Sequence, residues 1–305
     1  MGFGLFFLSL MAFASLYGQT DTLYYDPASG NYIIRYLGTT VGNQDTMVTV
    51  VYEPPTKIDP KVEGFVYPSS HGDYAYRYRI TNGPLAEQNL NEYSLHFGDG
   101  VSVESVTPTT SWDNVRPKNF LPDTGFASRW VWRGHQGLQA TWYVDSCIII
   151  SDGLPSITDS YTQAKKGIWV WPAGGPNQKD TLASDIRTWL LKLRAYPNMN
   201  VLRKTVGPKL PPEQFQSLGF LDTLKSYITQ SRSLGWITRQ ATTDKYTRLV
   251  DSVRLNLLAN NHSIAKTKLD SILLYVHADS ATTLTSEAYA LIRFNTEYLK
   301  TIIVK

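Results

Sequence analysis

Hydrophobic and polar residues alternate with a period of two along much of the chain, from Asn31 to about Val206. The alternation is clearest in residues 74–80. One face of this segment carries Tyr74, Tyr76, Tyr78 and Ile80, and the opposite face carries Arg77 and Arg79. Such a pattern is typical of a strand with one buried face.

Turn signals separate these short strand-like segments at close spacing, for example Asn-Gly-Pro at 82–84 and Gly-Asp-Gly at 98–100. Many short strands with such turns favour an antiparallel sandwich over a parallel α/β sheet. We therefore predict an α+β multidomain chain that contains an antiparallel β-sandwich of the Ig-like kind at 19–207. One stretch near 181–196 has apolar residues at helical spacing, which predicts a single inserted helix.

The period changes to 3.6 residues after Glu213, which predicts a small helical bundle over 214–305. Its four helices are marked by four apolar sets: Leu221, Leu224 and Ile228; Tyr246, Leu249, Val250, Val253 and Leu257; Ala265, Leu269, Ile272 and Val276; Leu284, Ala288, Leu291, Tyr298 and Ile302. Three prolines lie between the two patterns, so a linker is expected at 208–213.

The first residues form an apolar run without charge, from Phe3 to Leu16, with small residues near its end at Ala12 and Ala14 and after it at Gly18. This pattern predicts a secretory signal peptide at 1–18 and an exported, extracellular or surface-associated protein. The alternative is an apolar first strand or a misassigned start. No other apolar stretch reaches the roughly 18 residues of a membrane span, so none is expected after signal removal.

Several segments resemble known secreted modules. The first resemblance is carried by Leu-Gly-Trp-Ile at 234–237, the helix that follows it, residues 284–291 and Tyr-Leu at 298–299. Over about 215–303, the chain resembles the helical FIMAH module found at the ends of secreted bacterial multidomain proteins. Residues 55–60, 76–82 and 152–157 resemble the β-sandwich that precedes this module in some uncharacterised secreted proteins. The resemblance implies location and architecture, and it implies no catalytic residues.

Charge is nearly balanced, with 29 basic and 26 acidic residues. This balance argues against a nucleic-acid binder, which normally carries a concentrated basic face. Residues 214–305 hold 11 basic and 7 acidic residues, which suits either an anionic surface polymer or a solvated helix face. Cys147 is the single cysteine and lies in an apolar segment, so we expect a buried thiol and no internal disulfide.

Catalytic signatures are missing from the sequence: it has no zinc-protease helix motif, nucleophile elbow, phosphate-binding glycine loop or calcium loop. We therefore expect no cofactor, no metal and no catalysis. Three alternatives remain open for the carboxylates: turn formation, adventitious calcium binding, or a glycosidase-like pair that the sequence cannot place across a cleft. The residues concerned are Asp99, Asp113, Asp123, Asp145 and Asp152.

Tryptophans crowd between residues 112 and 171. Trp130 with Trp132, and Trp169 with Trp171, each occupy one face of a strand, and exposed indoles on such a face could stack on sugar rings. The competing interpretation is that they fill the space between two sheets. These four residues are the candidate ligand platform.

The sequence thus predicts an exported, non-catalytic interaction or structural protein. Its partner would be a cell-surface polysaccharide or another exported protein. The first alternative is a carbohydrate-binding protein that uses the tryptophan-rich face, and the second is a hydrolase with an unrecognised acidic site.

Overall fold

The structure is a computed structural model, which describes residues 22–39, 45–69, 73–97, 101–106, 112–115, 126–132, 136–164, 168–170 and 200–303. The chain divides into two compact units. Unit 1 takes Met1–Pro55 and Lys166–Met199, and unit 2 takes Thr56–Lys165 and Asn200–Lys305.

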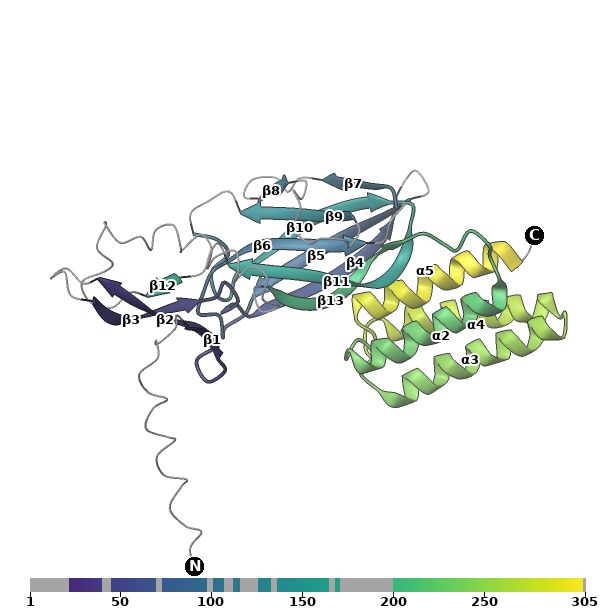
Figure 1. Cartoon of the computed structure of the whole chain (residues 1–305). Helices are drawn as coiled ribbons and strands as arrows, with labels where there is room; N and C mark the ends of the chain where they lie inside the picture. Colours follow the sequence, from purple (N-terminus) through teal and green to yellow (C-terminus); the bar gives the residue numbers. More distant parts are fainter. Residues whose placement is uncertain are drawn as a thin grey trace, which may run out of the picture. The chain divides into compact units, whose positions relative to one another are not determined.

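Unit 1 contains a four-stranded antiparallel sheet with the strand order β1-β2-β3-β12 (Figure 1). Its strands are β1 (Thr22–Asp26), β2 (Asn31–Thr39), β3 (Asp45–Glu53) and β12 (Ile168–Val170). Tyr32 and Tyr52 are paired across β2 and β3 and form the small buried cluster of this sheet.

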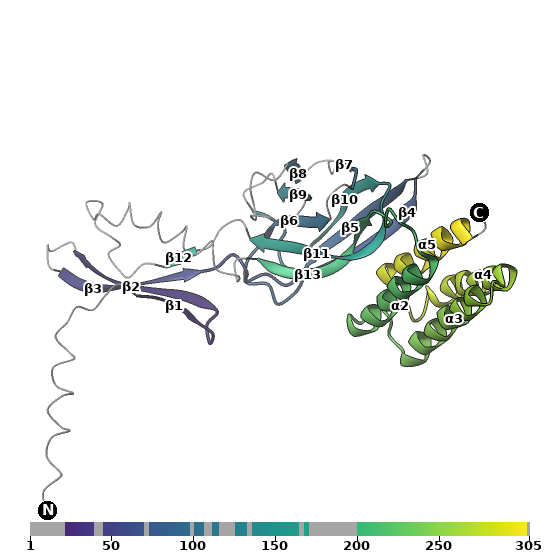
Figure 2. The same ribbon diagram turned by 45° about the vertical axis from the view of Figure 1, so that its right-hand side comes forward.

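Unit 2 contains two antiparallel sheets (Figure 2). The first has the order β4-β5-β10-β7, formed by β4 (Pro60–Pro68), β5 (Tyr74–Asn82), β10 (Tyr143–Ser151) and β7 (Val103–Val106). The second has the order β13-β11-β6-β9-β8, formed by β13 (Val201–Lys209), β11 (Leu154–Ala164), β6 (Leu90–Phe97), β9 (Phe126–Trp132) and β8 (Trp112–Val115).

The two sheets of unit 2 pack face to face through aromatic side chains. The Tyr78 ring on β5 lies with its centroid 5.7 Å from that of Tyr93 on β6 and 6.4 Å from that of Trp130 on β9. All three side chains are wholly buried, and Cys147 on β10 is buried with them. The predicted antiparallel sandwich and the buried thiol are confirmed.

The four predicted helices are present as α2 (Ser217–Ser233), α3 (Gln240–Leu258), α4 (His262–Asp279) and α5 (Ser286–Ile303). The apolar positions that predicted them point into the bundle: Leu224, Val250 and Ile272 are examples with no exposed surface. Within the part of the chain that the structure describes, no helix is long and apolar enough to cross a membrane.

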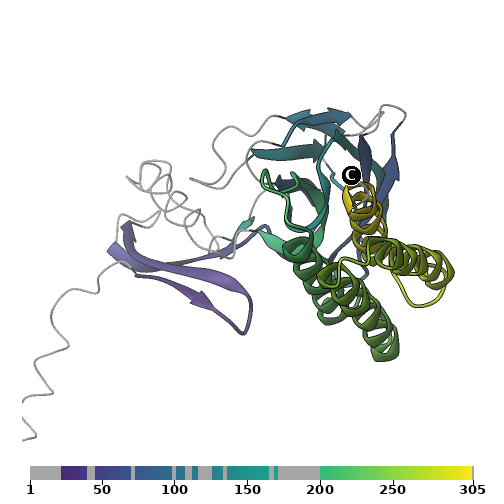
Figure 3. The ribbon, with the colours of Figure 1, turned by 90° about the vertical axis from the view of Figure 1, so that its right-hand side faces the viewer.

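Helix α5 packs against the sandwich (Figure 3). The Glu287 carboxylate accepts a hydrogen bond from the Gly64 N–H of edge strand β4, at 2.8 Å. Further along the helix, Asn295 Nδ2 donates to the Pro155 carbonyl at 2.9 Å, and the rings of Phe294 and Tyr74 meet edge to face. The sandwich and the helices consequently share one hydrophobic core.

The structure divides the chain at different places from the expected boundaries. The expected linker at 208–213 lies inside unit 2, because β13 continues through Pro208 to Lys209 as an edge strand that pairs with β11. Proline is tolerated at a sheet edge, where its missing N–H costs no ladder bond. Strands β1 to β3, expected to belong to the sandwich, form the separate sheet of unit 1.

Two predictions concern segments outside the described residues. These are the signal peptide at 1–18 and the inserted helix near 181–196.

Candidate functional site

The outward side of the β4-β5-β10 sheet carries an ordered set of polar and aromatic side chains, which we call the outer face. Residues that are paired directly across strands share a side of the sheet, so the register defines four rows. The rows are Lys61, Thr81 and Tyr143; Glu63, Arg79 and Asp145; Phe65, Arg77 and Ile148; Tyr67, Ala75 and Ile150. Asp145 joins its row through a bulge in β10 rather than through a direct pair.

The outer face arises from the alternation seen in the sequence. In β4 and β5 the side chains that point inward are buried, and those between them are exposed or half-buried. Tyr143 keeps 63% of its surface exposed and Tyr67 keeps 47%. The face therefore offers aromatic rings to a partner at its first and last rows.

Two arginines at the centre of the outer face share one carboxylate. Arg77 Nη2 and Arg79 Nη2 each lie 2.7 Å from Asp145 Oδ2, and Arg77 Nε also donates to the Asp145 carbonyl. The hydrogen bond and the charge of Asp145 raise the pKa of the Arg79 guanidinium above its ordinary value. Both guanidiniums are thereby held in fixed positions, although about 40% of each side chain remains exposed.

Aromatic rings flank Arg79. Its Cζ atom lies 5.7 Å from the Phe65 ring centroid and 5.4 Å from that of Tyr143. A guanidinium over a ring face is attracted by the ring quadrupole, which further fixes both groups. The centre of the outer face is thus an ordered cluster of cation, anion and rings.

A buried asparagine supports the turn that precedes Tyr143. Asn82 accepts a hydrogen bond from Thr141 N–H, donates its own N–H to the Trp142 carbonyl, and donates from Nδ2 to the Leu138 carbonyl. Thr141 has φ of 68°, which a β-branched residue seldom adopts. These bonds hold the strained turn and leave Trp142 half exposed beside Tyr143.

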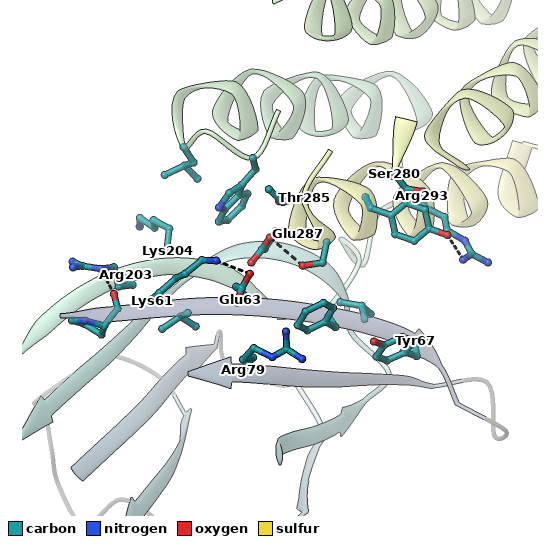
Figure 4. A pocket seen from close by; sticks show the side chains of 18 of the residues that line it. Lys61, Glu63, Tyr67, Arg79, Arg203, Lys204, Ser280, Thr285, Glu287 and Arg293 are labelled. Atoms are coloured by element: carbon teal, nitrogen blue, oxygen red, sulfur yellow. Dashed lines mark hydrogen bonds and ion pairs between the residues drawn. The ribbon is translucent and has the colours of Figure 1, made fainter. Parts of the chain in front are cut away.

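A cleft of about 1010 Å³ lies between the outer face and the helices (Figure 4). Its strand side contains Lys61, Glu63, Phe65, Tyr67 and Arg79, and β13 adds Arg203 and Lys204. Its helical side contains Leu234, Trp236, Ser280, Thr285, Glu287, Tyr289 and Arg293. The cleft therefore continues the outer face toward α5.

Most charges of the cleft are paired. Lys61 lies 2.8 Å from Glu63, Lys204 pairs with Asp159, and Arg293 Nε lies 2.8 Å from Glu297. Arg203 instead donates to the carbonyls of Pro60 and Leu202, at 2.9 Å each. The partners of Arg203 are thus uncharged backbone carbonyls, unlike the carboxylates that pair with Arg79 and Arg293.

Two carboxylates line the same cleft, Glu63 on β4 and Glu287 on α5. The Glu287 side chain is almost wholly buried, with 3% exposure, and one of its oxygens accepts the Gly64 N–H. Glu63 retains 29% exposure of its side chain. Glu287 thus connects helix α5 to strand β4 through this hydrogen bond.

The structure separates the four tryptophans of the candidate platform. Trp130 has no exposed surface and stacks on Tyr93 inside the sandwich, so it has no face to offer a ligand. Trp132 is half-buried and meets buried Trp112 edge to face. Trp169 lies on β12 in unit 1, paired with Tyr52, and Trp171 lies outside the described residues.

Among the described residues, no group of three or more His, Cys, Asp or Glu side chains could hold a metal ion. Of the aspartates considered from the sequence, Asp145 lies on the outer face, Asp113 lies on β8 and Asp152 lies in the β10–β11 turn. Asp99 and Asp123 are outside the described residues.

Sequence reasoning missed the outer face as a site. Arg77 and Arg79 were visible as the polar side of a tyrosine-rich strand, which was the available signal. Their common partner Asp145 lies 66 residues beyond Arg79, and only the pairing of β5 with β10 brings them together.

Comparisons with known proteins leave the family open. No protein-family model matches the chain, and no curated protein matches it. One solved structure is similar, an uncharacterised protein from Nocardia farcinica whose crystal structure is described as an immunoglobulin-like fold. It shares 10% identity, the match covers 40% of this chain and 89% of that one, and the TM-score of 0.26 is too low to support any conclusion.

Proposed function

We propose that this chain is an exported, non-catalytic binding protein whose outer face, together with the adjoining cleft, holds its partner. The observation that carries the proposal is the fixed pair Arg77 and Arg79, flanked by exposed rings at Tyr143 and Tyr67. Tyrosine and arginine dominate the binding energy of many interfaces, and groups fixed before binding lose little entropy when a partner arrives.

The cell exterior is the proposed location. The charge-free apolar start and the resemblance of 215–303 to the FIMAH module both support export. Cleavage near Gly18 is expected, and the mass of the protein recovered from the medium or cell surface tests it. An intact Met1 in that protein would contradict the signal peptide.

A pull-down from the cell envelope tests the binding function. The full mature chain with Tyr67→Ala and Tyr143→Ala should retain at least about tenfold less envelope material than wild type, since both exposed rings are lost. The matched control is Tyr275→Ala on α4, which removes a tyrosine of similar exposure, 41%, away from the outer face. Equal retention by all three proteins would contradict the proposal.

A hydrolase is the second candidate, because Glu63 and Glu287 line one cleft and paired carboxylates hydrolyse glycosidic bonds. Binding is favoured, since Glu287 is buried and engaged with Gly64. Purified protein should show no turnover on polysaccharide and ester substrates. Turnover that Glu63→Gln abolishes would replace the binding function with a catalytic one.

A further inference from the structure

The charge of the outer face and cleft is weakly positive. The cations are Lys61, Arg77, Arg79, Arg203, Lys204 and Arg293, and the acids beside them are Glu63, Asp145, Asp159, Glu287 and Glu297. A densely charged polymer such as nucleic acid needs many unpaired cations along its track. The surface instead suits a partner whose negative charges are few and spaced.

The central arginines suit carboxylates in particular. A guanidinium has five N–H donors in a planar fork that matches the two oxygens of a carboxylate. Asp145 already shows this chemistry, since its Oδ2 accepts from both Arg77 and Arg79. Arg203, which donates to two backbone carbonyls, adds a further guanidinium on the cleft side of β4.

The rings suit the flat apolar faces of sugars. Tyr143 stands in the first row and Tyr67 in the last, and six residues of extended β4 separate those rows, about 20 Å at 3.3 Å per residue. A partner that reaches both rings is therefore an extended chain. Aromatic rings pack favourably on apolar faces through dispersion and burial.

We propose that the ligand of the outer face is an acidic glycan whose sugars carry carboxylate groups, laid diagonally across the sheet from Tyr143 on β10 to Tyr67 on β4 with its carboxylates at Arg77 and Arg79. This inference rests on the proposed binding function of the same face. It adds the chemical class of the ligand. In it, the tyrosine rings contact the sugar faces and the guanidiniums bind the carboxylates.

Calorimetric titration of the full mature chain with two probe pairs tests the inference. The probes are an oligogalacturonate and a hyaluronan oligosaccharide, each compared with its methyl ester, which keeps the rings and removes the charge. The acids should bind at least about tenfold more tightly than the esters, as expected when a charge-assisted hydrogen bond is lost. Variants should keep the wild-type circular dichroism spectrum.

Two variants separate the roles of charge and ring. Arg79→Gln should reduce the preference for acid over ester, whereas Tyr143→Ala should weaken acid and ester alike. Arg248→Gln, an exposed arginine on α3, is the charge-matched control and should behave as wild type. If Arg248→Gln reduced the preference for acid over ester as much as Arg79→Gln does, the inference would be contradicted, because the preference would then reflect general charge attraction.

Failure of the inference is distinguishable from failure of the proposed function. If acid and ester bind with equal affinity and Tyr143→Ala abolishes both, the carboxylate assignment is overturned. The proposal that the outer face is the binding surface would then still hold. No affinity for any probe, with envelope retention still dependent on Tyr67 and Tyr143, would overturn the glycan class and favour an exported protein partner. Envelope retention independent of these tyrosines would overturn the binding function itself.

Discussion

Cys147 on β10 shows how burial controls a single side chain. It is wholly buried among apolar residues, and this burial raises the pKa of its thiol well above the ordinary value. A thiolate is the reactive form, so a buried neutral thiol is inert. The sequence predicted this environment because the neighbours along the strand are apolar.

The thiol and three buried tyrosines predict a loss of stability at alkaline pH. Burial raises the pKa of Tyr76, Tyr78 and Tyr93, so these groups stay protonated in the fold. The unfolded chain loses the Cys147 proton near pH 8.5 and tyrosine protons near pH 10. The free energy of unfolding should be unaffected by these groups below about pH 8.5 and fall above it, by at most about 1.4 kcal/mol per pH unit for each group.

Urea unfolding between pH 7.5 and 10.5 measures this fall. Cys147→Ala should lack the part of the decline that begins near pH 8.5 and keep the part near pH 10. The comparison concerns the slope with pH, because the substitution also changes packing. A free energy of unfolding that rises through this window would contradict the assignment.

Gly137 and Gly219 form a matched pair for backbone effects. Gly137 has φ of 68°, and a Cβ there would lie 2.9 Å from the Leu90 carbonyl oxygen, whereas the nearest atom to a Cβ at Gly219 in α2 is 4.0 Å away. Gly137→Ala should destabilise the protein by about 1–3 kcal/mol, and Gly219→Ala should stabilise it by about 0.5–1 kcal/mol. Thermal unfolding measures both, and similar effects of the two variants would contradict the backbone assignment.

At the scale of elements, sequence periodicity predicted the four helices of the bundle and the alternation within β5 well, whereas it did not single out β4. The clustering of Arg77, Arg79 and Asp145 could not be predicted, because it depends on which distant strand pairs with β5 and on the bulge between Val144 and Cys147. Likewise, the inward side chain of Trp130 follows from which side of β9 meets the other sheet. Alternation specifies two faces of a strand without stating which one is covered.

The contact between α5 and β4 depends on Glu287. Glu287→Ala leaves the buried Gly64 N–H without its acceptor and should destabilise the protein by about 1–3 kcal/mol. Glu287→Gln keeps a side chain of similar shape with one acceptor oxygen and should lower the free energy of unfolding by less. Urea unfolding compares the two variants. A larger loss of stability in Glu287→Gln than in Glu287→Ala would contradict this role of Glu287.

At the scale of the whole molecule, the sandwich and the helices of unit 2 share a core, although the prolines near 208–213 predicted a hinge between them. The sequence shows the prolines and the change of period, but the packing of α5 on the sandwich depends on contacts between residues far apart, such as Asn295 and Pro155. We therefore expect one cooperative transition for unit 2.

The single cysteine allows this cooperativity to be measured. Reactivity of Cys147 with a thiol reagent reports opening of the sandwich, and circular dichroism at 222 nm reports loss of the helices. Both should show the same urea midpoint. Helices that persist after Cys147 becomes reactive would support the hinge expected from the sequence instead.

Hydrogen–deuterium exchange of the full mature chain, with and without a solubilised envelope fraction, tests the central claim most directly. If the outer face is the binding surface, protection should increase in β4, β5 and the start of β10, around Tyr67, Arg79 and Tyr143, and remain unchanged in α3. Protection confined to α3 and α4, or none anywhere at saturating envelope material, would contradict the account.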